Sequence, residues 1–205
     1  MKHVVLVGDG MGDYPVEGLG GRTPLQAAHA PTMARIAGLG EVRLVQTVPA
    51  GMPPGSDVAN LALLGYNAAS NYTGRAPIEA AGAEIPMKPS DVAFRCNLVT
   101  VRDGVMNDYS AGHITTEEGR ALIAAVQKGL GGEGLAFHPG VQYRHLLVWD
   151  GGPADCVCTP PHEITDKPVG GYLPRGGRQD EIRRLMERSK EILADHPVNR
   201  KRVAE

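Results

Sequence analysis

Two short apolar runs near the start of the chain have the pattern of buried strands. Residues 3–7 are rich in valine and stop at a glycine-rich stretch, and residues 41–48 alternate between apolar and polar well enough for a second strand. Between the runs, Thr23 followed by proline is typical of a helix N-cap, and residues 32–37 favour a second helical piece. The pattern predicts strands and helices in alternation, with a functional loop after the first strand.

A change in composition occurs at residues 67–77, where small and turn-forming residues predominate. We place a domain junction there, near residues 72–75. The other expected elements are a helix at 56–64, a strand at 92–101 with a hairpin partner at 104–109, a helix from a cap at Thr115 to about 130, a strand at 141–149 and an amphipathic helix at 178–194. The chain is therefore predicted to be α/β, with one part at residues 1–72 and a second at 73–200.

The composition narrows the class of protein. Of the 205 residues, 42% are apolar, so the chain can bury a core, and 27 glycines with 16 prolines indicate many turns. A net charge of -2 argues against a nucleic-acid partner held by bulk charge. No apolar run approaches the ~18 residues that cross a bilayer, and the first residues do not resemble a signal peptide. We expect a cytoplasmic protein without membrane contact, its three cysteines reduced.

Asp9 follows the first predicted strand directly and is the first candidate functional residue. Ligand sites in open α/β folds lie at the carboxyl ends of strands, where a carboxylate can bind a divalent cation. Asp9 and Asp13 can equally be turn residues that hydrogen bond to the backbone between glycines. The glycines at 8, 10 and 12 do not fit the dinucleotide-binding fingerprint.

Ser56 opens a predicted helix after a stretch of proline and glycine. Its hydroxyl would face free backbone N–H groups and the positive end of the helix, which suits a nucleophile or a phosphoryl group attached to it. The alternative is an ordinary serine N-cap. A neighbouring cation would favour the nucleophile, because a metal-bound hydroxyl loses its proton more readily.

Several longer strings of the chain are individually uncommon. They occur in order along essentially the whole chain, at residues 4–13, 21–28, 54–61, 72–80, 94–99, 111–114, 143–145 and 160–165. Together they resemble the archaeal-type cofactor-independent phosphoglycerate mutases, which belong to the alkaline phosphatase superfamily. The resemblance implies an α/β chain in which residues 1–72 form the N-terminal part of a metal-binding, phosphatase-like sheet domain. Residues 73–200 would be an inserted α/β domain that clamps the substrate, and residues 201–205 the return to the first domain.

The same resemblance assigns the reaction centre. It implies that Ser56 is both the nucleophile and a metal ligand, that Asp9 is a second ligand, and that two divalent ions bind: manganese, magnesium or zinc. No 2,3-bisphosphoglycerate would be needed, and the substrate would be a small phosphorylated acid. Members of the family run past the C-terminus of this chain, so the resemblance implies a missing C-terminal half with further Asp and His ligands. No Asp-x-x-x-His string occurs here.

Arginine and histidine residues in the family-like strings are the candidates for substrate binding. The planar fork of arginine binds phosphate and carboxylate in bidentate fashion, and histidine can contact substrate or carry a proton. For each arginine the alternative is a surface or interdomain ion pair, and for each histidine a hydrogen-bonded structural role. The candidates are Arg75, which can also simply brace the hinge, Arg95, Arg144, His113, His145 and His162.

We therefore expect the parent protein to be a metal-dependent isomerase of glycolysis and gluconeogenesis. It would convert 3-phosphoglycerate to 2-phosphoglycerate through a phosphoserine, with this chain alone incomplete and inactive. Two alternatives stay open: a homologous phosphotransferase such as a homoserine kinase, and a non-catalytic fragment that only binds a phosphorylated acid.

Overall fold

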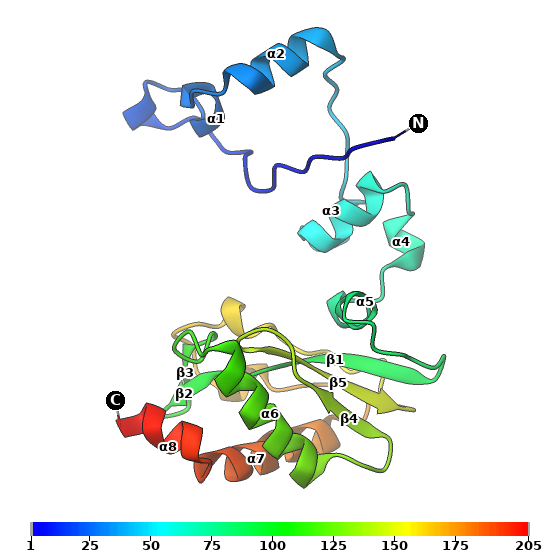
Figure 1. Cartoon of the computed structure of the whole chain (residues 1–205), viewed down its shortest axis with the longest axis vertical. Helices are drawn as coiled ribbons and strands as arrows, with labels where there is room; N and C mark the ends of the chain where they lie inside the picture. The colour runs from blue at the N-terminus through cyan, green and yellow to red at the C-terminus, as the bar shows by residue number, and fades with distance from the viewer. Residues whose placement is uncertain (1, 205) are drawn as a thin grey trace. The chain divides into compact units, whose positions relative to one another are not determined.

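The computed structural model describes residues 2–204, which divide into two compact units with the boundary between Tyr72 and Thr73. The first unit holds only short helices. They are the 3-10 helix η1 (Glu17–Leu19), α1 (Pro24–Ala27), α2 (Pro31–Leu39), α3 (Ser56–Leu63) and α4 (Ala68–Asn71) (Figure 1). The helices predicted after Thr23, at 32–37 and at 56–64 are confirmed.

The local sequence explains where α1 begins. The Thr23 hydroxyl accepts a hydrogen bond from the Gln26 N–H at 3.2 Å, and the Gln26 side chain accepts one from the Thr23 N–H at 2.9 Å. This reciprocal capping box satisfies two backbone donors that a helix start leaves free, and proline at the first helical position needs no partner.

The prediction of two strands in this unit is wrong. Within residues 2–72 no strand forms, and residues 3–7 and 41–46 have no regular structure. Val4, Leu6 and Leu44 are 90%, 92% and 105% exposed. A strand exists only when its backbone N–H and C=O groups pair with a neighbour, and no described segment pairs with either run, so the apolar pattern finds no sheet to join.

The second unit contains every strand among the described residues and most of the helical residues. Its elements are α5 (Arg75–Gly82), β1 (Asp91–Asn97), β2 (Thr100–Arg102), β3 (Val105–Asp108), α6 (Thr116–Leu130), β4 (Leu135–His138), β5 (Arg144–Asp150), the 3-10 helices η2 (Pro161–Glu163) and η3 (Val169–Tyr172), α7 (Gln179–Ala194) and α8 (Pro197–Ala204). No described helix has the length and apolar character to span a membrane.

An antiparallel sheet in the order β1-β5-β4 lies at the centre of this unit, with α6 and α7 on one face and α5 on the other (Figure 1). The predicted hairpin forms between β2 and β3. The single strand predicted at 92–101 breaks after Asn97, and α4, α5, β4 and α8 were not predicted. The mixed α/β class is confirmed.

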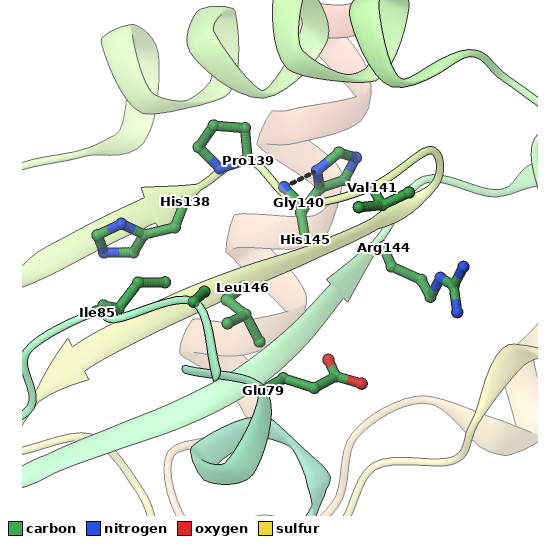
Figure 2. Close-up of a pocket in the computed structure, with 10 residues that line it drawn as sticks. Glu79, Ile85, His138, Pro139, Gly140, Val141, Arg144, His145 and Leu146 are labelled. Atoms are coloured by element: carbon green, nitrogen blue, oxygen red, sulfur yellow. Dashed lines mark hydrogen bonds between the residues drawn. The ribbon is translucent and has the colours of Figure 1, made fainter. Parts of the chain in front are cut away.

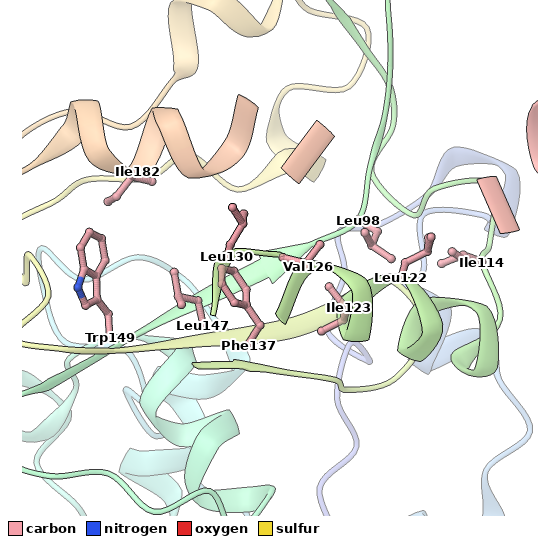
Figure 3. Close-up of a cluster of buried hydrophobic side chains, with 10 residues drawn as sticks. All are labelled: Leu98, Ile114, Leu122, Ile123, Val126, Leu130, Phe137, Leu147, Trp149 and Ile182. Carbon is pink, nitrogen blue, oxygen red and sulfur yellow. The ribbon is translucent and has the colours of Figure 1, made fainter. Parts of the chain in front are cut away.

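Strand alternation decides which residues of the sheet enter the core. Phe94 and Cys96 of β1 face α6 and α7, whereas Ala93 packs against α5. The core itself consists of Leu98, Ile114, Leu122, Ile123, Val126, Leu130, Phe137, Leu147, Trp149 and Ile182 (Figure 3). The α6 members recur at helical spacing, and Thr115 with Glu118 forms the capping box at the start of that helix.

Candidate functional site

Ser56 and Asp9 come together in the first unit although 47 positions separate them in the sequence. The Ser56 hydroxyl donates a hydrogen bond to Asp9 Oδ2 at 3.0 Å, and both residues are exposed. Gly55, not Ser56, is the N-cap residue of α3, and no side chain caps this helix. Ser56 is therefore the first residue of the helix, and its hydroxyl is used for the contact with Asp9.

The start of α3 is held in place by a contact that the sequence did not reveal. Asp57 follows Ser56 in the sequence, and its Oδ2 accepts a hydrogen bond from the hydroxyl of Tyr72. Asp57 also places a negative charge in the first turn, where it interacts favourably with the helix dipole. These contacts stabilise the first turn of α3, which carries Ser56.

The contact between Ser56 and Asp9 permits two kinds of chemistry. A carboxylate that accepts the hydroxyl hydrogen can draw the proton from a nucleophilic serine. Carboxylate and hydroxyl oxygens are also donors that hard divalent cations prefer. Two donors are fewer than the six or more that such cations take, and no group of three or more His, Cys, Asp or Glu that could hold a metal occurs within residues 2–204. Asp9 and Ser56 thus fit part of a metal site.

His145, predicted as a substrate contact, lies in the core of the second unit. It is 1% exposed and faces Gly119 of α6, where a Cβ would lie 3.1 Å from the His145 ring. Its Nδ1 accepts a hydrogen bond from the Gly140 N–H at 3.0 Å, and its buried Nε2 has no well-formed hydrogen bond. Burial lowers the pKa of His145 to about 4, with the Gln142 backbone offsetting this only in part. The ring is therefore neutral near pH 7.

Arg95 lies on the opposite face of the sheet, beneath α5. Its Nε is 3.2 Å from Glu79 Oε2 of that helix, and the Arg95 side chain is 23% exposed. The contact lacks hydrogen-bond geometry, so Nε is a buried donor without a hydrogen-bonded partner. Glu79 was not predicted, because only the packing of α5 on β1 brings it to Arg95.

Arg144 and His162 approach each other through two tyrosines that the sequence analysis did not single out. The Tyr109 ring lies edge-on to Tyr143 at 5.8 Å and to His162 at 6.1 Å, and the Arg144 guanidinium is 5.2 Å from the centre of the Tyr143 ring. The isolated positions of tyrosine in the sequence carry no signal for this cluster, since strand β5 and the loop around η2 must first meet.

His113 belongs to a strained loop that follows Tyr109 in the sequence. Ala111, Gly112 and His113 all have positive φ, near 52°, 64° and 53°, which costs free energy for residues other than glycine. Asp108 stabilises the loop by accepting hydrogen bonds from the backbone N–H groups of Ser110 and Gly112. Burial by itself would raise the pKa of Asp108, but the hydrogen bonds from Ser110 and Gly112 and the charge of His113 together lower it below its ordinary value. The loop presents His113 to solvent.

Arg75 is the first residue of α5 and follows Gly74, whose φ of 130° lies in a region almost restricted to glycine. The sequence candidates thus do not form one cluster within the second unit. Arg144 and His162 lie at opposite ends of one tyrosine pair, Arg95 pairs with Glu79, and His145 is buried.

A pocket of about 320 Å³ was not predicted either. It lies between α5 and the connection from β4 to β5 (Figure 2). Its lining residues are Glu79, Ala83, Ile85, His138, Pro139, Gly140, Val141, Arg144, His145 and Leu146.

The chain is thus a mixed α/β protein that carries a serine at the start of a helix beside a carboxylate. Residues 37–199 match the model of the family described as 2,3-bisphosphoglycerate-independent phosphoglycerate mutase. The chain belongs to this family, and the resemblance stated above is confirmed.

The chain is similar to known members of this family in sequence and in structure. The 2,3-bisphosphoglycerate-independent phosphoglycerate mutase of Methanothrix thermoacetophila is 53% identical over 204 residues, which cover 100% of this chain and 51% of that protein. The solved structure of the cofactor-independent phosphoglycerate mutase of Thermoplasma acidophilum is 32% identical, with a TM-score of 0.55 over 95% of this chain and 53% of that one. A structure from Pyrococcus horikoshii has 27% identity and a TM-score of 0.67, covering 96% and 45%. The chain spans about half the length of the curated relatives that it matches.

Proposed function

We propose that these residues belong to an isomerase that converts 3-phosphoglycerate to 2-phosphoglycerate without 2,3-bisphosphoglycerate, through a phosphoserine on Ser56. The observation that carries this proposal is the 3.0 Å contact between Ser56 Oγ and Asp9 Oδ2 in a chain of this family. Ser56 Oγ forms a bond to phosphorus while the bond from phosphorus to the C3 oxygen of 3-phosphoglycerate breaks. Asp9 holds the serine hydroxyl hydrogen, and a proton ends on the glycerate oxygen that leaves. The phosphoserine then returns the phosphoryl group to the other hydroxyl of the glycerate.

Asp9 and Ser56 supply part of the site for two divalent cations, with manganese, magnesium or zinc as the expected ions. Their oxygen atoms lie 3.0 Å apart and are donors that suit such cations. Bound cations would stabilise negative charge on the phosphoryl oxygens and ease loss of the serine proton. In this proposal residues 1–72 are part of a phosphatase-like domain, and relatives of about twice the length supply further ligands.

The second unit would hold the glycerate while it reorients. Arg144 and His162, linked through Tyr109 and Tyr143, offer a guanidinium and an imidazole on one surface. Arginine suits both the carboxylate and the phosphate of the substrate. Arg95, Arg75 and His113 stay candidates for the same role, whereas burial of His145 favours a structural role for that ring.

The nucleophile is tested by Ser56→Ala in a protein of the relatives' full length that contains these residues. Mutase activity should fall at least about 10³-fold, as when other nucleophiles are removed, and the fold should persist. Ser70→Ala, another exposed serine of the same unit, is the matched control and should keep activity. Mass spectrometry of enzyme quenched with substrate should locate phosphate on Ser56. Activity that survives Ser56→Ala, or phosphate only at another residue, rejects the assignment.

The 205-residue polypeptide by itself should show no mutase turnover, because Asp9 and Ser56 alone do not complete a metal site. Formation of 2-phosphoglycerate would be assayed with added manganese, alongside a full-length relative as the positive control. A rate within the ordinary enzyme range of about 1–1,000 per second would contradict this expectation. Homoserine and ATP, offered in a parallel assay of the full-length protein, test the kinase alternative.

A further inference from the structure

The pocket beneath α5 is lined by strands β4 and β5, the connection between them, and α5 with the residues that follow it. Strand register aligns His138 of β4 and Arg95 of β1 on either side of Leu146 of β5, on the face that α5 covers. Ala76 and Ala80 of α5 pack near Leu146 and leave the side toward β4 open. The open space has a volume of about 320 Å³, at the lower end of the range for small-molecule sites.

The walls of this pocket are mostly hydrocarbon. Ile85 lies on the side of α5, Pro139 and Val141 on the side of the connection from β4 to β5, and Leu146 between them (Figure 2). Ala83, the residue at the end of α5, also lines the pocket. A phosphoglycerate has no hydrocarbon part that could exchange water for these walls, and burying its charges there would cost free energy. The pocket therefore fits a different ligand from the proposed substrate.

The charges around the pocket are unbalanced. Glu79 is paired with Arg95 at 3.2 Å, so its charge is largely compensated. Arg144 makes no ion pair with any residue that the structure describes, and its contact is with the Tyr143 ring. One guanidinium at the edge of an apolar pocket thus lacks a counter-charge. Arginine forms strong, paired hydrogen bonds with a carboxylate.

We propose that this pocket binds a small carboxylic acid with a compact branched hydrocarbon body. The carboxylate pairs with Arg144, and the hydrocarbon body lies against Ile85, Val141 and Leu146. The pocket does not depend on the nucleophile proposed at Ser56, because its walls belong to residues 79–146. It does take Arg144 away from the candidates for holding the glycerate, so the two roles of Arg144 exclude each other. An occupant would also draw the Arg144 guanidinium toward the pocket.

The probe is 4-methylpentanoate, titrated into the 205-residue chain with ¹³C-labelled methyl groups and followed by NMR. Saturable shifts are expected at the methyl groups of Ile85, Val141 and Leu146, with a dissociation constant of about 1 mM, while Ile123 in the core stays unchanged. Arg144→Gln should weaken binding about tenfold or more, since a charge-assisted pair is lost. Arg102→Gln, at another exposed arginine, is the matched control and should leave binding of 4-methylpentanoate unchanged.

Two further ligands separate the contributions of charge and hydrocarbon. 4-Methylpentanamide keeps the body without the charge and should bind more weakly, and 3-phosphoglycerate should not shift the three methyl groups. The proposal is overturned if the shifts do not saturate, if the amide binds as well as the acid, or if Arg144→Gln binds normally. Displacement of the probe by 3-phosphoglycerate would also overturn it, by showing that the pocket is part of the substrate site.

Discussion

The two units of this chain have similar apolar patterns in sequence and very different packing. In the second unit ten apolar residues form one buried core between the sheet and two helices. In the first unit only Val58 and Ala68 are buried apolar residues among those that the structure describes. Val4, Leu6 and Leu44, with strand-like surroundings in sequence, stay exposed.

The difference lies in where the partners of each segment come from. Strand β5 finds β1 on one side and β4 on the other, so its backbone groups are paired and its side chains are covered on both faces. Residues 3–7 and 41–48 have no described partner. Apolar periodicity therefore gives the capacity for a strand, and a neighbouring strand is needed to realise it.

The largest expected effect is on folding itself. A polypeptide of residues 73–205 should be monodisperse and unfold cooperatively, because it contains a complete core. Residues 1–72 alone should lack a cooperative transition and self-associate through exposed apolar segments. Circular dichroism in urea and light scattering measure both properties. A cooperative, monomeric 1–72, or an unfolded 73–205, would erase the difference between the units.

Core truncation should separate the units by several kcal/mol. Leu147→Ala removes a buried side chain of β5 and should lower the free energy of unfolding of the second unit by about 3 kcal/mol. Leu44→Ala, the matched change at an exposed position of the first unit, should change it by less than about 0.5 kcal/mol. Urea denaturation provides both values, and equal effects would mean that the packing described here is wrong.

Acid should destabilise the second unit through His145. Burial lowers its pKa in the folded state to about 4 from an ordinary value of 6.5, so folding favours the neutral ring. The stabilisation is full above pH 6.5 and is lost progressively as the pH falls toward 4, by up to about 3 kcal/mol. His145→Gln should flatten the pH dependence of stability in this window. His29→Gln, in the first unit, should leave it unchanged; a flat wild-type profile would refute the assignment.

The smallest expected difference comes from two capping boxes with the same geometry. Thr115→Ala at the start of α6 should cost about 1 kcal/mol of unfolding free energy, because α6 is packed into the core. Thr23→Ala removes the equivalent cap of α1, a four-residue helix without buried residues, and should leave the stability of the second unit unchanged. A Thr115→Ala variant as stable as wild type would show that the cap adds little to a packed helix.

Much of the local structure was predictable because its causes are local. The caps at Thr23 and Thr115, the amphipathic spacing of α7 and the turn between β2 and β3 depend on residues a few positions apart. Strand β4 was missed because four residues give too little periodicity for recognition.

The site divides in the same way. Family-like strings pointed to Asp9 and Ser56, and the structure brings these two into contact. No spacing rule predicts the ion pair of Arg95 with Glu79 or the pocket beside Arg144, because they depend on how α5 lies on the sheet. The signal for burial of His145 was its place in a predicted strand, but the alternation leaves open which face is the core.

The sequence by itself determined the capped starts of α1 and α6, the α/β class and the family, since caps, periodicity and characteristic strings are read directly along the chain. Only the tertiary structure decided which apolar runs are buried and which polar residues meet. Burial and pairing require a second surface, and that surface is contributed by residues distant in sequence. Residues 144–150 acquire such neighbours in β1 and β4, whereas residues 3–7 acquire none among the residues described.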